Sequence, residues 1–161
     1  MAYTIFTPLV GATPIAVSDT SARHAIGTIV EAIDPVYGLG EFIYLNGVAS
    51  TAVGSVVTYD QKNGTTTLAA HLSRGPVAVA MSANVAGQFG WYQISGAAVP
   101  AVAGAVVAGS LVYATSTAGS LDDAVVATDK IDGAVWTVAA SGAGQGTAVA
   151  QLDRPALNGN G

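Results

Sequence analysis

The side chains best suited to catalysis are two histidines, His24 and His71, which lie far apart in the chain. His24 closely follows Asp19 and Ser21, so a base, a carboxylate and a hydroxyl are near one another in sequence. A hydrolytic triad needs these groups in contact, which sequence proximity alone does not provide. There is also no G-x-S-x-G motif to present a nucleophile on a sharp turn. We therefore interpret both histidines as surface or turn residues and predict that the protein is not an enzyme.

No group of residues has the spacing of a metal or phosphate site. The chain has no cysteine and only two histidines, so a zinc site lacks a ligand cluster. Asp122 and Asp123 are not followed by a calcium-binding D-x-D-x-D-G loop, and we interpret them as a solvated turn before the next strand. The glycine-rich run at 142–146 precedes a strand-like segment where a phosphate loop needs a helix, so it is interpreted as a turn. We expect no metal and no cofactor.

The aromatic residues Trp91, Tyr92 and Trp136 are the remaining candidates for ligand binding. Exposed rings could stack on the apolar faces of sugars and form a carbohydrate-binding platform. Core packing is the simpler interpretation, because residues 91 and 92 alternate across a strand, so that one should pack in the core and the other should face outward. The two interpretations differ in whether the rings are accessible in the folded chain.

Charged residues are scarce. They make up 9% of the sequence, against roughly 25% in ordinary soluble domains, and none occurs between Arg74 and Asp122. A soluble monomer usually carries surface charge, so either this surface consists of Ser, Thr, Gly, Ala and Asn or neighbours cover much of it. We interpret the deficit as evidence for an assembly in which the charge-free stretch is buried between protomers. The net charge of −5 and the five scattered basic residues disfavour nucleic acid as a partner.

The apolar run at 97–114 approaches the length of a membrane-spanning helix, about 20 residues. It consists mainly of Ala, Gly and Val, contains Pro100, and has glycines where turns would separate short strands. We predict buried sheet here and no membrane partner. The first residues lack the basic and apolar regions of a signal peptide, so we expect none.

The sequence predicts an all-β fold, an antiparallel sandwich or barrel. Short runs of Val, Ile, Thr and Tyr alternate with the 20 glycines, and no helical periodicity is evident. Asn63-Gly64 predicts a hairpin with a two-residue type I′ turn, and Ala118-Gly119 predicts a second hairpin. The expected strands are 27–33, 41–45, 55–59, 66–70, 76–81, 91–94, 111–114, 134–138 and 148–152.

One hairpin unit occurs three times in the sequence. The segments that start at Gly75 and Gly133 both contain a strand, an Ala-Gly-Gln turn and a second strand, and a looser copy starts at Gly27. Two similar connectors start at Gly54 and Gly109. We therefore predict three hairpins that stack on a shared core and are joined by hairpin-like inserts.

The N-terminal segment differs from the repeats, since Pro8 and Pro14 interrupt its β-like composition. We predict an extended arm at 1–17, a single β domain at 18–155 and a flexible tail at 156–161. The arm has no charge, so docking it on a partner or neighbouring protomer, instead of its own core, costs little desolvation. An ordinary first strand of the same sheet is the alternative. The candidate contact residues are Tyr3, Ile5, Phe6, Leu9, Val10 and Ile15.

Residues 21–60, SARHAIGTIVEAIDPVYGLGEFIYLNGVASTAVGSVVTYD, resemble the capsid decoration (cement) proteins of tailed bacteriophages and their prophage relatives. The segment GPVAVAMSANVAGQFGWYQISG at 75–96 and the closing AVAQLDRP are similar to the same family. The resemblance extends from about Ser18 to Pro155. Its motifs are turn-and-strand patterns, so no binding residue of the family can be carried over.

The resemblance implies a β-rich, trimeric structural protein on the outer surface of a phage head. Such proteins clamp neighbouring major capsid proteins after the shell expands. We therefore expect a virion protein that reaches the head from the host cytoplasm, binds the major capsid protein, forms a homotrimer and needs no cofactor. The alternative is a carbohydrate- or receptor-binding component of a head fibre or spike base, which would use the aromatic platform.

Overall fold

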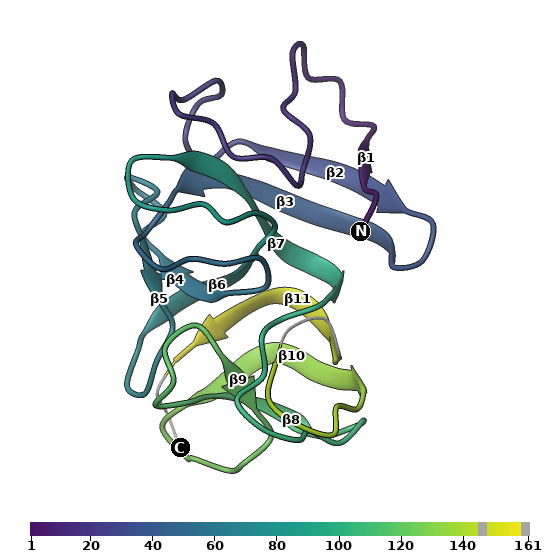
Figure 1. Ribbon diagram of the computed structural model, residues 1–161, viewed down its shortest axis with the longest axis vertical. Helices are drawn as coiled ribbons and strands as arrows, with labels where there is room; N and C mark the ends of the chain where they lie inside the picture. Colours follow the sequence, from purple (N-terminus) through teal and green to yellow (C-terminus); the bar gives the residue numbers. More distant parts are fainter. Residues whose placement is uncertain (145–147, 159–161) are drawn as a thin grey trace.

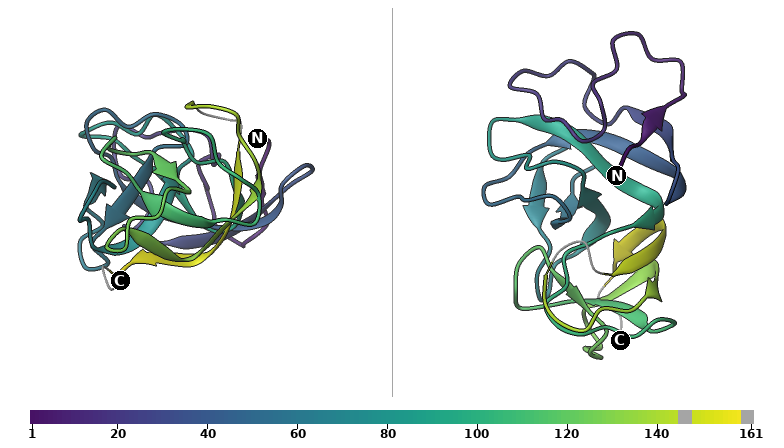
Figure 2. Two further views of the ribbon diagram at one scale, coloured as in Figure 1. Left: turned by 90° about the horizontal axis from the view of Figure 1, so that it is seen from below. Right: turned by 45° about the vertical axis from the view of Figure 1, so that its right-hand side comes forward.

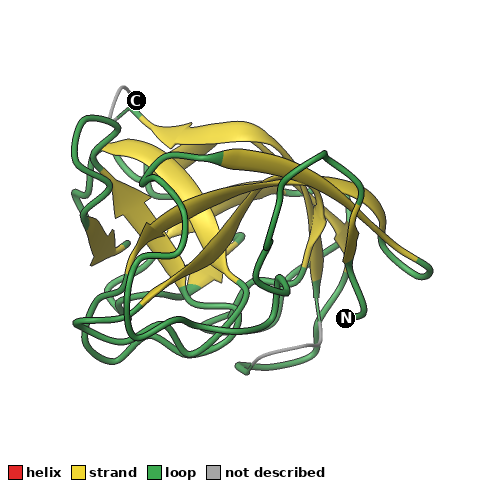
Figure 3. Cartoon of the chain, turned by 90° about the horizontal axis from the view of Figure 1, so that it is seen from above, coloured by secondary structure: helices red, strands yellow, loops and turns green. Residues whose placement is uncertain are grey.

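A computed structural model describes residues 1–144 and 148–158, and this part of the chain is all-β and contains no helix (Figures 1 and 3). Every pairing between its named strands is antiparallel. The predicted fold class is therefore confirmed. The strands are β1 (Thr4–Ile5), β2 (Ile29–Asp34), β3 (Gly38–Asn46), β4 (Val56–Tyr59), β5 (Thr66–Leu68), β6 (Gly75–Ala80), β7 (Phe89–Ala98), β8 (Leu111–Ala114), β9 (Leu121–Asp122), β10 (Lys130–Val138) and β11 (Val149–Leu157).

The strands form one open sheet in the order β1-β2-β3-β7-β6-β11-β10-β8-β9. Strand β4 branches from β6 and carries β5, and β7 also pairs with β11. Strands β1 to β3 lie at one end of the molecule, and β8 to β10 lie at the other (Figures 1 and 2). The last strand, β11, thus connects the two ends.

The predicted repeat corresponds to three hairpins, β2–β3, β6–β7 and β10–β11, and the connectors form the hairpins β4–β5 and β8–β9. The turn type predicted at Asn63-Gly64 is wrong. The connection from Asp60 to Thr65 is longer than two residues, and only Gly64 has a positive φ, +68°. The Asn63 side chain instead accepts a hydrogen bond from the Thr65 amide at 3.0 Å.

Central strands are buried on both faces, which explains the scarcity of charge in this part of the chain. In β6, Val77 and Val79 pack in the largest hydrophobic cluster, while Ala78 and Ala80 pack in another on the opposite face. A strand covered on both sides carries a continuous apolar run. Much of the charge-free stretch is interior of its own chain, so burial between protomers is not needed to explain this part of the charge deficit, and such burial stays a prediction.

The apolar run at 97–114 contributes the end of β7, the whole of β8 and the connection between them. No helix long and apolar enough to cross a membrane is present among the residues that the structure describes. The predicted strand character of this run is confirmed at both of its ends.

At both termini, strand pairing extends beyond the boundaries predicted for the β domain. Strand β11 continues to Leu157, which is 1% exposed and pairs with Ile131, so the sheet passes the predicted boundary at 155. At the other terminus, Thr4 and Ile5 pair with β2 of the same chain, and Ile15 is 2% exposed. The predicted arm therefore differs from the structure at Ile15, which packs with Phe42 and Trp91 in a hydrophobic cluster of its own chain.

Candidate functional site

The residues that could resemble a catalytic triad form a structural hub around Asp19. Its buried carboxylate accepts hydrogen bonds from the Thr13 hydroxyl at 2.9 Å and the Tyr44 hydroxyl at 2.7 Å. Arg23 forms an ion pair with the same carboxylate, with 3.0 Å between Nε and Oδ1. His24 makes no hydrogen bond to Asp19; its Nε2 accepts one from the Thr13 amide at 3.3 Å. The hub joins the N-terminal segment to β3 and orients no nucleophile.

The hub also keeps Tyr44 in its neutral form. Burial, followed by the hydrogen bond to the Asp19 carboxylate, raises the pKa of Tyr44 to about 12. A hydroxyl with such a pKa stays protonated at neutral pH and donates a hydrogen bond instead of acting as a base or nucleophile. Tyr44 therefore stabilises the fold.

His71 contacts a different carboxylate, that of Asp129, through Nδ1. Asp129 also accepts a hydrogen bond from the Leu72 amide at 3.0 Å. Burial alone would raise the pKa of Asp129, but the hydrogen bonds from His71 and Leu72 outweigh burial and hold it below its usual range. This pair joins the loop after β5 to the loop before β10. Within residues 1–144 and 148–158, no three His, Asp or Glu residues gather in a group that could hold a metal ion.

The aromatic residues do not form an exposed platform. Trp91, Tyr92 and Trp136 are each 0% exposed, and their polar atoms make hydrogen bonds inside the protein. Trp91 and Tyr92 do point to opposite faces of β7, but both faces are covered. The expectation that one ring faces outward is therefore wrong.

The acidic pair and the glycine-rich loop have structural positions. Asp122 belongs to the short strand β9, which the sequence did not predict, and Asp123 accepts a hydrogen bond from the Val107 amide at 2.8 Å. In the loop at 142–146, residues 145 and 146 lie outside the described part of the chain. The equivalent turn between β6 and β7 is confirmed, with Gly87 at a φ of +80°.

The six candidate contact residues of the N-terminal segment divide into two groups. Ile15 is buried, and Tyr3, Ile5 and Leu9 pack against the same cluster of their own chain. Phe6 is 52% exposed and Val10 is fully exposed, so these two remain accessible to a partner. The prolines indicate an extended segment but not which of its side chains are buried, because the inward-facing positions depend on how the segment folds over β2 and β3.

Exposed apolar side chains concentrate at the end of the molecule built from residues 1–39. Eight of the sixteen exposed large hydrophobic residues in the described chain lie in this stretch, including Val36 at 82% exposed. Strand β2 shows the clearest pattern, since its outward positions 29 and 33 are both isoleucine. This pattern is visible in the sequence IVEAID, but only the structure shows that Ile29 and Ile33 stay exposed among the described residues.

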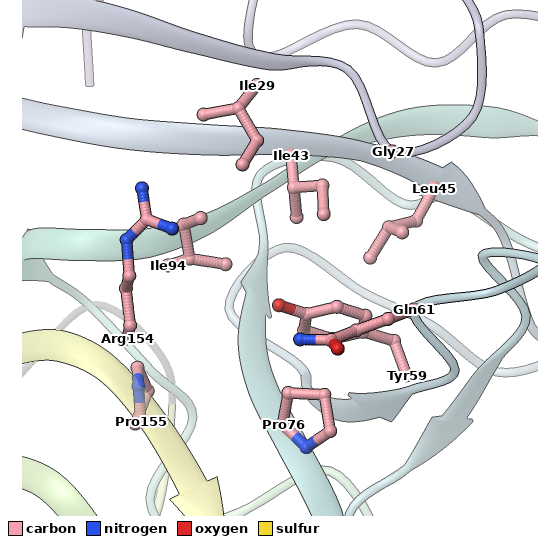
Figure 4. Close-up of a pocket in the computed structure, with 10 residues that line it drawn as sticks. All are labelled: Gly27, Ile29, Ile43, Leu45, Tyr59, Gln61, Pro76, Ile94, Arg154 and Pro155. Atoms are coloured by element: carbon pink, nitrogen blue, oxygen red, sulfur yellow. The ribbon is translucent and has the colours of Figure 1, made fainter.

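A groove of about 270 Å³ adjoins this exposed end (Figure 4). Ile43, Leu45 and Ile94 give it an apolar floor, and Ile29 of β2 forms part of its wall. Arg154 lies on one side of the groove, while Tyr59 and Gln61 lie on another (Figure 4). Burial raises the pKa of Tyr59, so its hydroxyl is neutral at the groove. The groove can accept a large apolar side chain, because a cavity of about 150 Å³ already holds a benzene ring.

Comparison with protein-family models, with curated proteins and with solved structures finds no match to this chain.

Proposed function

We propose that this protein is a structural, non-enzymatic component of a virion that binds the outer surface of a tailed-phage head and stabilises the capsid lattice. The observation that carries the proposal is the concentration of exposed apolar side chains on residues 1–39, including Phe6, Val10 and Val36. Apolar patches on a soluble chain typically mark surfaces that bind other proteins.

Two further features support a binding role over a catalytic one. The histidines and the buried carboxylates are used in contacts that hold loops and the N-terminal segment in place. The resemblance of residues 21–60 and 75–96 to capsid decoration proteins supplies the partner, the major capsid protein. Burying apolar surface at many equivalent lattice positions would strengthen a shell without any cofactor.

The homotrimer is part of the proposal and is supported mainly by the resemblance, because burial within the chain itself accounts for much of the charge-free stretch. Native mass measurement tests it directly, and we expect a mass of three chains in solution or threefold clusters of density on the particle.

The function is tested with expanded, undecorated heads of the phage or prophage that encodes this chain. We expect the purified protein to sediment with the heads to saturation and to raise the temperature at which they disrupt. Heads that leave the protein in the supernatant at tens of micromolar would rule out the decoration role.

The alternative role in carbohydrate binding has no observation in its favour. It required exposed rings at Trp91, Tyr92 or Trp136, and all three are buried. Receptor binding through another surface would be detected as binding to host cells by a protein that does not bind heads.

A further inference from the structure

Among the described residues, the outer face of the β2–β3 hairpin is exposed, except where Ile43 packs in a hydrophobic cluster and Arg154 contacts Glu41. Three cross-strand pairs define it, and the pair nearest β4 is Ile29 opposite Ile43, which line the groove. Because side chains alternate between the two faces of a strand, the next residues on this side are Glu31 and Glu41, followed by Ile33 and Leu39. We call Ile29, Glu31, Ile33, Leu39 and Glu41 the hairpin face. The opposite face of the hairpin is buried beneath the N-terminal segment.

The hairpin face carries two carboxylates directly opposite each other, and only one has a cationic partner. Arg154 of β11 binds Glu41 with two hydrogen bonds, Nε to Oε2 at 3.2 Å and Nη2 to Oε1 at 2.9 Å. Glu31 has no ion pair among the described residues. Like charges on facing strand positions destabilise a sheet. The folded chain thus holds an unbalanced negative charge between the exposed Ile29 on one side and the exposed pair of Ile33 and Leu39 on the other.

The hairpin face is already ordered before any partner binds. The Asp34 carboxylate accepts hydrogen bonds from the amides of Val36 and Tyr37, at 2.7 and 2.9 Å, and so fixes the turn. This turn projects beyond the rest of the sheet at the right-hand side of Figure 1. A preformed surface loses little conformational freedom on binding.

We propose that the hairpin face and the adjoining groove bind an extended segment of a shell protein in which a lysine or arginine lies between two large apolar residues, each two positions away. The charge on Glu31 selects the cation. The groove takes one apolar side chain, and Ile33 with Leu39 takes the other. The spacing follows from the strand, because residues two positions apart lie about 6.6 Å apart both in β2 and in an extended partner.

This inference rests on the proposed function for the source of the segment. A second copy of this chain is a different occupant, and an oligomer that depends on the hairpin face would show it. The two cases are separated by measuring head binding and oligomeric state on the same variants.

The decisive variant is Glu31→Gln, which removes the unpaired charge and keeps the shape. We expect its melting temperature to lie between that of the wild type and a value about 3 °C higher, since the repulsion with Glu41 is relieved. We expect binding to undecorated heads to weaken about 5- to 10-fold, with a shallower dependence on salt, because one charge pair is lost. The control for head binding is Asp132→Asn, which makes the same charge change on β10 at the other end; because it also removes the ion pair with Lys130, melting temperatures are not compared between the two variants.

A double variant, Ile33→Ser with Leu39→Ser, tests the apolar part of the hairpin face, with Val125→Ser at an 80% exposed position as its control. We expect the double variant to fold and to lose head binding, and the control to bind normally. Equal binding by wild type, Glu31→Gln and the double variant overturns the inference and leaves the decoration role intact. If the wild-type protein itself binds no heads, the proposed decoration role is wrong. An oligomer that dissociates in the double variant assigns the hairpin face to a second copy and also overturns the inference.

Discussion

At the scale of single residues, two buried carboxylates hold together parts of the chain that are distant in sequence. Asp19 fixes the N-terminal segment to β3 through Tyr44 and Thr13, and Asp129 fixes the loop after β5 through His71. A buried carboxylate is costly unless it is paired or hydrogen-bonded, so removing one donor leaves a penalty larger than the value of the bond itself. The histidines are thus explained by stability.

Replacing Tyr44 by Phe tests the Asp19 hub. We expect the free energy of unfolding to fall by about 1–2 kcal/mol, because the hydroxyl donates to a carboxylate that is only 7% exposed. Urea denaturation measures the change, and Tyr37→Phe is the control, since no hydrogen bond of its hydroxyl is found among the described residues. Spectrophotometric titration should also lose one tyrosine that ionises near pH 12.

Acid should weaken the Asp129 contacts. The folded-state pKa of Asp129 lies below its usual value, so the unfolded chain takes up the proton first as pH falls. This contribution is complete above about pH 4 and is lost as pH falls through the folded-state pKa. We expect Asp129→Asn to lower the free energy of unfolding by only about 1 kcal/mol at pH 7, because His71 is half exposed and solvent weakens its interaction with Asp129. Thermal melts should show that cost shrinking towards pH 3; a cost independent of pH would contradict the role of the charge.

At the scale of elements, the N-terminal segment acts as a cover for the inner face of β2 and β3. It contributes a two-residue edge strand and the buried side chain of Ile15, while Trp91 Nε1 donates a hydrogen bond to the Thr13 carbonyl at 2.9 Å. The segment is therefore divided between core packing and exposed positions such as Val10.

Two alanine substitutions separate these functions of the segment. We expect Ile15→Ala to lower the free energy of unfolding by about 2–4 kcal/mol, because it leaves a cavity in the core. Val10→Ala should change stability by less than about 0.5 kcal/mol, because the side chain is fully exposed. Denaturant titration of both variants gives the comparison. Equal stability of the two would show that residues 1–17 do not belong to the core.

At the scale of the whole molecule, the largest hydrophobic cluster and the His71–Asp129 contact join the two ends, and β11 links their strands. It pairs with β10 on one side and with β6 and β7 on the other. Trp91 reports on one half and Trp136 on the other, and each is buried in a different cluster. The described chain should therefore unfold as one cooperative unit.

Single-tryptophan variants test this cooperativity. In Trp91→Phe and in Trp136→Phe, we expect the fluorescence midpoint to coincide with the circular-dichroism midpoint of the same variant. The reason is that neither half keeps a complete sheet once β11 separates. A fluorescence transition that precedes the loss of strand signal in one variant would mean that the halves unfold separately.

The all-β class, the nine expected strand positions and the order of hairpins could be predicted from the sequence, because they depend on local properties. Glycine marks the turns, β-branched residues mark the strands, and a repeated pattern marks a repeated hairpin. The exposed isoleucines of β2 could also have been noticed, since Ile29 and Ile33 fall on one side of a strand.

Tertiary structure alone decided which faces are covered. Trp91 and Tyr92 are both buried because β7 has packing on either side, and Ile15 is buried because its segment folds back over β3. In the part of the chain that the structure describes, Glu31 lacks a cationic partner such as the one that Glu41 finds in Arg154, near the opposite end of the sequence. Such contacts join segments that are far apart in the chain. The alternation of residues within one strand shows which side chains share a face of the strand, but it does not show which segment packs against that face.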